Sequence, residues 1–319
     1  MNLLITGFSG HLGQAVAELL MHDNPFGRVF GVDRVTPRLL GPVYFVHADI
    51  RTVDLADLLV LDGIDVVLHL AYADGLGPGG PRDEPVFARR LLEATRLADT
   101  RRLVTVSRDW VYADIDGMRS ETSPLRTAMG PAAALIGAKV RAEALWTAAC
   151  AEEPAREVVT LRIPAVLGPA RDRLIDHALG LPWLVGPRDA TRTLQFLHVD
   201  DTAKALLAAA TAPGLNGPYN VAGAEPIGFD VVAGILEKRL VRPSPWLVRP
   251  LVGLFWRARG VPIRYADLGW FHSSAPMSSA RFAREAGFRP RYSTRQALAA
   301  WRVRYRALAG GASLSEVPS

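Results

Sequence analysis

Apolar and polar positions in the first half of the chain follow two alternating periods. Short apolar runs of strand length lie near residues 3–6, 28–33, 43–47, 65–71, 102–107 and 157–163. Between them, apolar residues recur at helical spacing near residues 12–21, 84–99 and 129–151. Such alternation predicts an α/β fold of the Rossmann type, a doubly wound parallel sheet with helices on both faces.

The pattern becomes irregular after Leu167, which indicates a smaller second lobe. Short strands are expected at 182–186 and 193–199, and helices at 201–210, 228–240, 246–258, 279–286 and 294–307. The predicted division is a cofactor-binding Rossmann domain at 1–165, to which segments around 190–225 return, and a C-terminal substrate-binding lobe over most of 166–309. A Gly/Pro-rich loop at 74–85 is expected to be mobile over the sheet edge, and 310–319 to form a flexible tail.

A glycine-rich turn directly follows the first predicted strand. The segment Thr6-Gly7-Phe8-Ser9-Gly10-His11-Leu12-Gly13 leads into a helical pattern, and Asp33 ends the second strand 20 residues beyond Gly13. Glycines at such positions allow a tight turn and close approach to a pyrophosphate, and the helix N-terminus offers amides to its oxygens. A carboxylate at Asp33 suits the ribose hydroxyls of NAD and disfavours NADP, although Arg34 and Arg38 could offset that preference.

Several motifs in order resemble the extended short-chain dehydrogenase/reductases, the NAD-dependent epimerase/dehydratase family. They are the Thr-Gly-x-x-Gly-x-x-Gly turn, Ala48–Arg51, His69–Tyr72, Leu161–Pro169, His198–Ala203, Tyr219–Val221 and Ala286–Pro290. The resemblance covers residues 1 to about 305. It implies that NAD contacts Gly7, Ser9, Gly10, His11, Leu12, Gly13, Asp33, Arg34, Asp49, Ile50, Leu70, Ala71, Tyr72, Lys139 and Pro164.

The catalytic set that the resemblance implies is incomplete. Members of this family use a Ser or Thr, a Tyr and a Lys, with the last two spaced as Tyr-x-x-x-Lys on one helix. Lys139 matches the lysine, but Leu135 stands at the tyrosine position and Arg108 at the hydroxyl position. Because leucine cannot exchange a proton, ordinary tyrosine-driven hydride chemistry is not expected.

Other groups near the predicted strand end are possible replacements. In sugar-nucleotide dehydratases of the family that the chain resembles, this strand end reads Thr-Asp-Glu-Val-Tyr, and Asp109 matches its aspartate, an acid in water elimination. The neighbouring indole of Trp110 could raise the pKa of Asp109 by desolvation. The alternative, which is favoured, is that Asp109 pairs with Arg108 or caps a turn. The catalytic candidates are Lys139, Asp109, Ser107 and Tyr112.

Candidate substrate contacts are aromatic and charged residues expected near the same sheet edge. Each has an ordinary alternative, an aromatic core position or a solvated charge. Trp183 and Arg192 are better placed, because the resemblance implies substrate contacts in that region. The full set is Tyr72, Asp74, Arg108, Trp110, His177, Trp183 and Arg192.

Composition narrows the class of protein. The 319 residues are 49% hydrophobic and carry a net charge of +5 with a single cysteine, Cys150. The lack of an apolar run of about 18 residues argues against a membrane span. Dispersed arginines argue against nucleic-acid binding. A single cysteine fits a reducing compartment, and the first strand begins at Leu3 with no secretory signal before it, so a cytoplasmic location is expected. No metal-ligand spacing occurs, and the alanine-rich run 132–149 would allow the homodimer that is common in the family.

Three functions remain open at this stage. The first is an NAD-binding epimerase, dehydratase or reductase with a rebuilt active site, acting on a nucleotide-sugar or a secondary-metabolite-like small molecule. The second is a lyase or cyclase without redox chemistry on the same fold. The third is a catalytically inactive nucleotide-binding scaffold or sensor, which the replacements Leu135 and Arg108 motivate directly.

Overall fold

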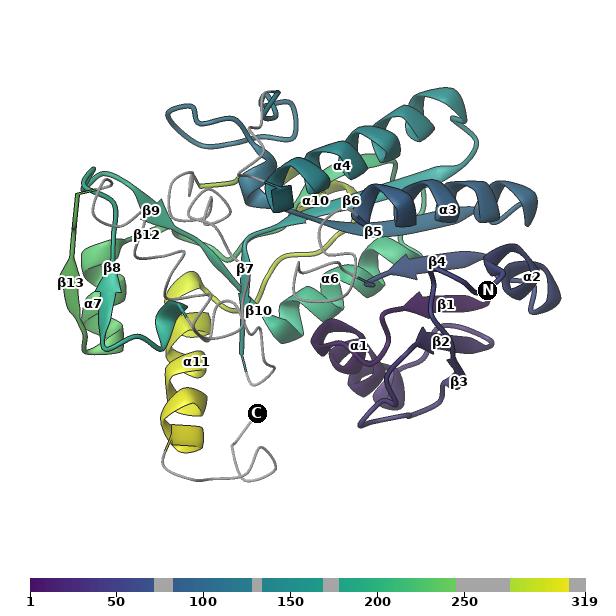
Figure 1. Ribbon diagram of the computed structural model, residues 1–319, viewed down its shortest axis with the longest axis horizontal. Helices are drawn as coiled ribbons and strands as arrows, with labels where there is room; N and C mark the ends of the chain where they lie inside the picture. Colours follow the sequence, from purple (N-terminus) through teal and green to yellow (C-terminus); the bar gives the residue numbers. More distant parts are fainter. Residues whose placement is uncertain (72–82, 128–133, 169–177, 245–275, 310–319) are drawn as a thin grey trace.

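The computed structural model describes residues 1–71, 83–127, 134–168, 178–244 and 276–309. A parallel sheet of seven strands lies at its centre, in the order β11-β6-β5-β4-β1-β2-β3 (Figure 1). The strands are β1 (Leu3–Thr6), β2 (Val29–Asp33), β3 (Tyr44–His47), β4 (Val66–His69), β5 (Arg102–Arg108), β6 (Glu157–Ile163) and β11 (Gly217–Asn220). The strand order reverses between β1 and β4, which is the switch point of a doubly wound sheet. The predicted fold class is therefore confirmed.

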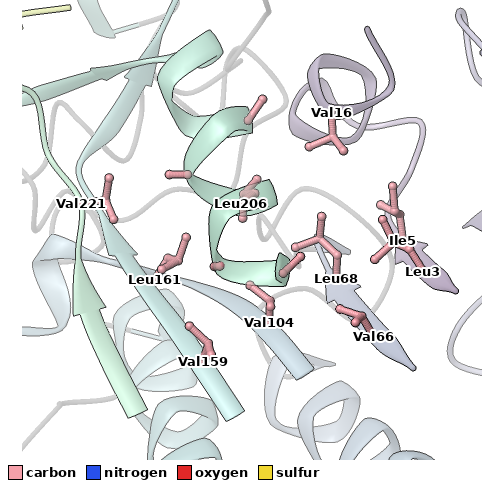
Figure 2. Packing of buried hydrophobic residues seen from close by; sticks show 14 of the residues in the cluster. Leu3, Ile5, Val16, Val66, Leu68, Val104, Val159, Leu161, Leu206 and Val221 are labelled. Carbon is pink, nitrogen blue, oxygen red and sulfur yellow. The ribbon is translucent and has the colours of Figure 1, made fainter. Parts of the chain in front are cut away.

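Helices cover both faces of the sheet, because alternate side chains of each strand point to opposite sides. Leu3 and Ile5 of β1 pack toward α1 (His11–His22) and α6 (Val199–Thr211). Figure 2 shows this face, where Leu206 of α6 lies among apolar side chains of β1, β4, β5 and β6. Leu4 belongs to the opposite core. The helices on that side are α2 (Leu55–Leu61), α3 (Asp83–Leu97) and α4 (Ala134–Glu152).

Three local features of the sheet and its helices differ from the sequence-based expectations. Strand β11 was not predicted, because its residues do not form an apolar run. Helix α2 was not predicted, because its seven residues are too few to show a clear period; the Asp54 carboxylate caps it by accepting from the amide of Asp57. The loop expected at 74–85 ends earlier than predicted, since residues 83–85 already form the start of α3. Residues 74–82 lie outside the described part of the chain.

The second lobe is built from short strand pairs and helices. Its strands are β7 (Ala165–Leu167), β8 (Trp183–Val185), β9 (Thr193–Leu194), β10 (Phe196–His198), β12 (Ile227–Gly228) and β13 (Arg239–Val241). They pair as β7 with β10, β9 with β12 and β8 with β13. Helices α7 (Phe229–Leu236) and α11 (Thr294–Ala309) lie beside these strands (Figure 1). Their shared core contains Phe229 and Trp301.

The expectation of a single helix over 228–240 is wrong in its second half. Glu237 adopts a left-handed conformation with φ +54°, which ends α7 after Leu236. The chain then continues as β13, which pairs with β8. The strand expected at 193–199 is likewise two strands, β9 and β10, separated by Gln195. The helix expected at 246–258 and the tail 310–319 fall outside the described residues.

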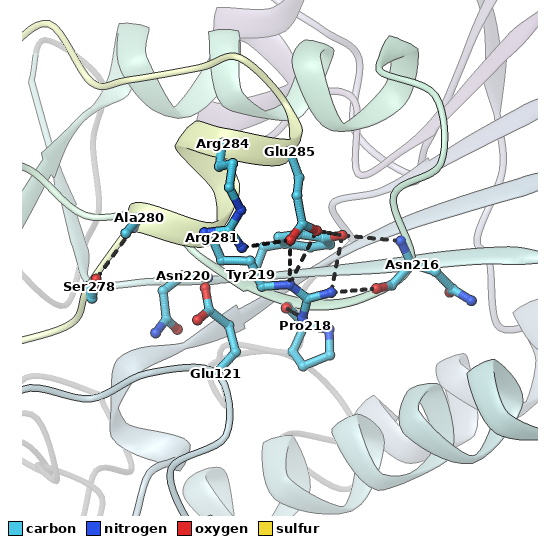
Figure 3. Close-up of polar contacts among 10 residues, drawn as sticks. All are labelled: Glu121, Asn216, Pro218, Tyr219, Asn220, Ser278, Ala280, Arg281, Arg284 and Glu285. Carbon is cyan, nitrogen blue, oxygen red and sulfur yellow. Dashed lines mark hydrogen bonds and ion pairs between the residues drawn. The ribbon is translucent and has the colours of Figure 1, made fainter.

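The edge of the sheet at β11 is closed by α10 (Ala280–Glu285). Figure 3 shows Arg281 lying over the ring of Tyr219, with its Cζ 4.3 Å from the ring centroid, while the Tyr219 hydroxyl donates to Glu285 at 2.8 Å. On the other side of β11, the amide of Asn220 donates to the Glu121 carboxylate at 2.9 Å. The last strand is thereby tied to the loop that follows β5. Among the described helices, none is long and apolar enough to cross a membrane.

Candidate functional site

The glycine-rich turn lies at the carboxyl ends of β1 and β4. Gly7 has φ +72°, and a Cβ there would stand 2.4 Å from the amide nitrogen of Ala71. A Cβ at Gly13 would stand 2.3 Å from the carbonyl oxygen of Phe8. The backbone is therefore packed too closely at both positions for any other residue. The turn brings Gly7 beside Leu70 and Ala71 at the end of β4, two residues that the resemblance implies as cofactor contacts.

Gly10 is the N-cap of α1, and because glycine has no side chain, it does not cap the amides of the first helical turn. The amides there point out of the helix N-terminus, which favours an anionic ligand. A dinucleotide pyrophosphate fits this arrangement, because the turn presents backbone rather than side chains to it. His11, Leu12 and Gly13, which the resemblance implies as cofactor contacts, form this first turn.

Asp33 is held in a defined orientation beside the turn. Its carboxylate accepts from the amide of Ser9 at 3.0 Å and from the amide of Val35 at 3.1 Å. The Ser9 hydroxyl in turn donates to the carbonyl of Val35. The acidic group predicted to bind a ribose is thus fixed at the end of β2, and the adjacent Arg34 is exposed.

Two further predicted cofactor residues follow β3. The Asp49 carboxylate accepts from the Arg51 side chain, and this bond lowers the pKa of Asp49. The Ile50 side chain is buried in the core that α2 and α3 cover. Asp49 therefore stays ionised at the sheet edge, while Ile50 can offer only its backbone to a ligand.

Lys139 lies in α4 with its ammonium buried beneath the end of β5. Its Nζ donates to the Glu84 carboxylate of α3 and to the carbonyl of Val106 at 3.1 Å. Burial lowers the pKa of Lys139, and the charge of Glu84 opposes that shift. Nearby, burial and then the charge of Lys139 lower the pKa of His69 to about 3. His69 is therefore a neutral structural residue, bonded to the Thr6 hydroxyl at 2.7 Å.

A buried polar network connects the other hydroxyl candidates. Ser107 donates to the Glu143 carboxylate at 2.5 Å, and Arg162 of β6 donates to the same carboxylate at 2.6 Å. Arg162 also donates to the Tyr112 hydroxyl at 2.8 Å, and that hydroxyl donates to Asn220 of β11 at 2.6 Å. Burial raises the pKa of Tyr112. Both hydroxyls are thus engaged in holding β5, α4, β6 and β11 together.

Arg108 and Asp109 stand where β5 ends and the short 3-10 helix η2 (Asp109–Val111) begins. Arg108 donates to the carbonyl of Pro164 at 3.2 Å, which joins two predicted site residues. Oδ1 of Asp109 is inaccessible and has no hydrogen-bond partner among the described residues. Burial raises the pKa of Asp109 to about 6, although the charge of Arg108 acts in the opposite direction. Trp110 packs in the core of the second lobe and is only 8% exposed.

The remaining predicted substrate residues fall into two groups. Trp183 begins β8 and is 50% exposed. Arg192 donates to both carboxylate oxygens of Asp114, at 2.6 and 3.2 Å, and so joins the lobe to the loop after β5. Tyr72, Asp74 and His177 lie outside the described residues. In the part of the chain that is described, no group of His, Cys, Asp or Glu could hold a metal ion.

Two carboxylates at this edge were not predicted from the sequence. Glu143 lies four residues after Lys139, which is the spacing of one helix face, so the pattern contained a signal for it. Glu84 is separated from Lys139 by 55 positions and gave no such signal. Leu135 occupies the first turn of α4, four residues before Lys139.

Comparison with known proteins agrees with this geometry. The model of the "NAD dependent epimerase/dehydratase family" matches residues 3–222. The chain belongs to this family.

The chain is also similar to one curated protein and to two solved structures over most of its length. The uncharacterized protein Rv0501 of Mycobacterium tuberculosis is 28% identical over 313 residues, covering 92% of this chain and 81% of the relative. The structure of MoeE5 in complex with UDP-glucuronic acid and NAD is similar with a TM-score of 0.74 at 24% identity, covering 97% of this chain and 100% of the other. UDP-glucuronic acid 4-epimerase from Bacillus cereus in complex with NAD gives a TM-score of 0.72 at 20% identity, covering 97% and 99%. At these identities the structural likeness supports the fold of the family.

Proposed function

We propose that this member of the family is an NAD-dependent enzyme of the epimerase or dehydratase type, in which Asp109 replaces the missing tyrosine as the proton carrier. The substrate would be a nucleotide-sugar or a similar small molecule. The similar solved structures contain NAD, and one of them contains UDP-glucuronic acid, which supports this class of ligand. The packed glycine turn and the oriented Asp33 support NAD as the cofactor.

The Asp109 carboxyl group is the observation that carries the proposal. A group that transfers protons near neutral pH needs a pKa near the working pH and an atom that is not already bonded to other protein groups. Burial raises the pKa of Asp109 to about 6, and its Oδ1 has no partner in the described chain. Ser107 and Tyr112 are less suitable, because both hydroxyls are engaged in the buried network.

The neighbouring residues have supporting parts in this proposal. Arg108 bonds to the carbonyl of Pro164, which holds the end of β5 against the β6–β7 junction and places Asp109 at the sheet edge. Bound NAD would supply a hydride acceptor, held by the glycine turn, Asp33 and Lys139. Trp183, half exposed, and Arg192, held by Asp114, are the groups on the lobe that a sugar nucleotide would contact.

Turnover of a substrate panel tests the proposal. The purified chain is mixed with NAD and a panel of UDP- and dTDP-sugars, and products and hydride-label transfer are followed across pH. The reaction rate of the wild type is expected to change with pH near pH 6, where Asp109 titrates, and this change should disappear in Asp109→Asn. The variant should also react about 10²- to 10⁴-fold more slowly. Asp57→Asn, on the exposed side of α2, is the matched control and should leave the rate unchanged. An Asp109→Asn variant with full activity and the same pH dependence would contradict the assignment.

A second function, a nucleotide-binding scaffold or sensor, is favoured by one observation. Ser107, Tyr112 and Lys139 are all bonded to protein groups in the buried interior. In that case NAD binds but no member of the panel turns over, and Asp109→Asn changes nothing. Turnover without transfer of hydride label would instead indicate the non-redox lyase or cyclase.

A further inference from the structure

Glu84 and Lys139 form an ion pair between two helices on the same face of the sheet. Glu84 is in the first turn of α3, and Lys139 is in α4. Each side chain is only 6% exposed. Helices α3 and α4 lie side by side over the sheet (Figure 1), so the pair joins them at the end nearest the carboxyl edge of β5.

The Lys139 ammonium is oriented by a second bond as well as by the carboxylate. Its Nζ donates to the carbonyl of Val106, two residues before Arg108 at the end of β5. Both positive and negative charges lie around it. The charge of Arg108 disfavours the protonated form of Lys139, whereas the charges of Glu84 and Glu143 favour it. Without Glu84, the ammonium would keep Arg108 as a neighbour and lose its directly bonded counter-charge.

A buried ion pair is a poor device for stability alone. Apolar residues of similar volume often stabilise a protein equally well, because desolvation of two charges offsets most of their attraction. This pair stands at the functional edge of the sheet, in a chain with only three lysines. Its position therefore points to a role in placing the ammonium.

We propose that Glu84 is the positioning residue of Lys139, and that Lys139 contributes to dinucleotide binding only while the Glu84 carboxylate holds it against the end of β5. The inference rests on the proposed function, since the ligand is the same NAD. Helix α3 would then contribute a residue to the site, in addition to the glycine turn and the end of β5.

Titration calorimetry of the full chain with NAD tests this inference with four variants. They are Glu84→Gln, Lys139→Met, the double variant, and the control Glu93→Gln on the exposed side of α3. Each of the first two should weaken NAD binding by about tenfold, which corresponds to the loss of about one hydrogen bond to a charged group. The double variant should bind no more weakly than either single one, because both changes remove the same interaction. The control should bind as the wild type does.

The outcomes separate the inference from the proposed function. If the wild type binds no dinucleotide, both are overturned. If it binds NAD and Glu84→Gln binds equally well, the inference alone is overturned, whatever happens to the unfolding temperature. Should Glu84→Gln not fold, Glu84→Asp takes its place, since it keeps the charge but sets the carboxylate back by one methylene. Weaker NAD binding by that variant supports the positioning role, and unchanged binding overturns it.

Discussion

The nucleotide turn and the end of β5 lie on the same sheet edge but are built in different ways. The turn is defined by backbone, because Gly7 and Gly13 have no room for a Cβ. The β5 end is defined by charged side chains, namely Arg108, Asp109 and the Glu84–Lys139 pair. A backbone site tolerates almost no substitution, whereas a side-chain site can be rebuilt on an unchanged frame. A chain can therefore carry the glycine turn together with Leu135 and Arg108 at the positions where the resemblance implies a tyrosine and a hydroxyl.

The two regions also differ in where their free energy comes from. The turn depends on close packing and on glycine conformations. The region behind β5 depends on a continuous polar network in which Glu143 is 1% exposed and Arg162 is 3% exposed. In such a network each charge is stable only while its partner is present. The predictions below disturb the two regions separately.

The largest effect on stability is expected from Arg162→Met, which breaks the buried polar network that links Ser107, Glu143 and Tyr112. The change leaves the Glu143 carboxylate buried without its guanidinium and removes a donor to Tyr112. The free energy of unfolding should fall by about 3–5 kcal/mol. Chemical denaturation measures it, with Arg96→Met as the control, because Arg96 pairs with Glu153 on the surface. A loss no larger than that of the control would mean that the network is not a structural element.

The next effect is expected from Gly7→Ala, which disturbs the nucleotide turn. The new Cβ would meet the backbone of Ala71 at 2.4 Å in a residue with φ +72°. The free energy of unfolding should fall by about 2–4 kcal/mol, and NAD binding should be lost. Gly214→Ala is a matched control, since Gly214 also has φ +72° but no atom within 4 Å of a Cβ. It should cost about 1 kcal/mol and leave NAD binding unchanged. Equal losses in the two variants would show that close packing is not what excludes a side chain at Gly7.

The same distinction decides what could be predicted from the sequence. Apolar periodicity predicted six of the seven central strands, because the buried strands of a parallel sheet read as apolar runs. Strand β11 was missed, since its residues Gly-Pro-Tyr-Asn do not form such a run. Short elements such as α2 and the end of α7 were missed or misplaced. Their limits depend on single residues, such as the Asp54 cap and the left-handed Glu237, rather than on a period.

The candidate site divides in the same way. The spacing of Gly7, Gly13 and Asp33 predicted which residues meet at the turn, since a local motif dictates that geometry. The partners of Lys139 and Arg162 could not be predicted with equal success. Glu84 lies 55 residues from Lys139, and only the packing of α3 against α4 brings them together. Side-chain sites depend on such distant contacts, which leave little trace in spacing.

The smallest effect is expected from Asp33→Ser, which changes the selectivity of the turn without disturbing its backbone. A serine can still accept from the amide of Ser9, but it removes the charge that disfavours the 2′-phosphate of NADP. The exposed Arg34 then remains as a cation beside the turn. The ratio of NADP to NAD affinity should rise about tenfold, which corresponds to about 1.4 kcal/mol. Calorimetric titration with both cofactors measures the ratio, and adding Arg34→Ala to Asp33→Ser should cancel most of the gain. An unchanged ratio would mean that the Asp33 carboxylate does not face the ribose, and the turn would then recognise only the pyrophosphate.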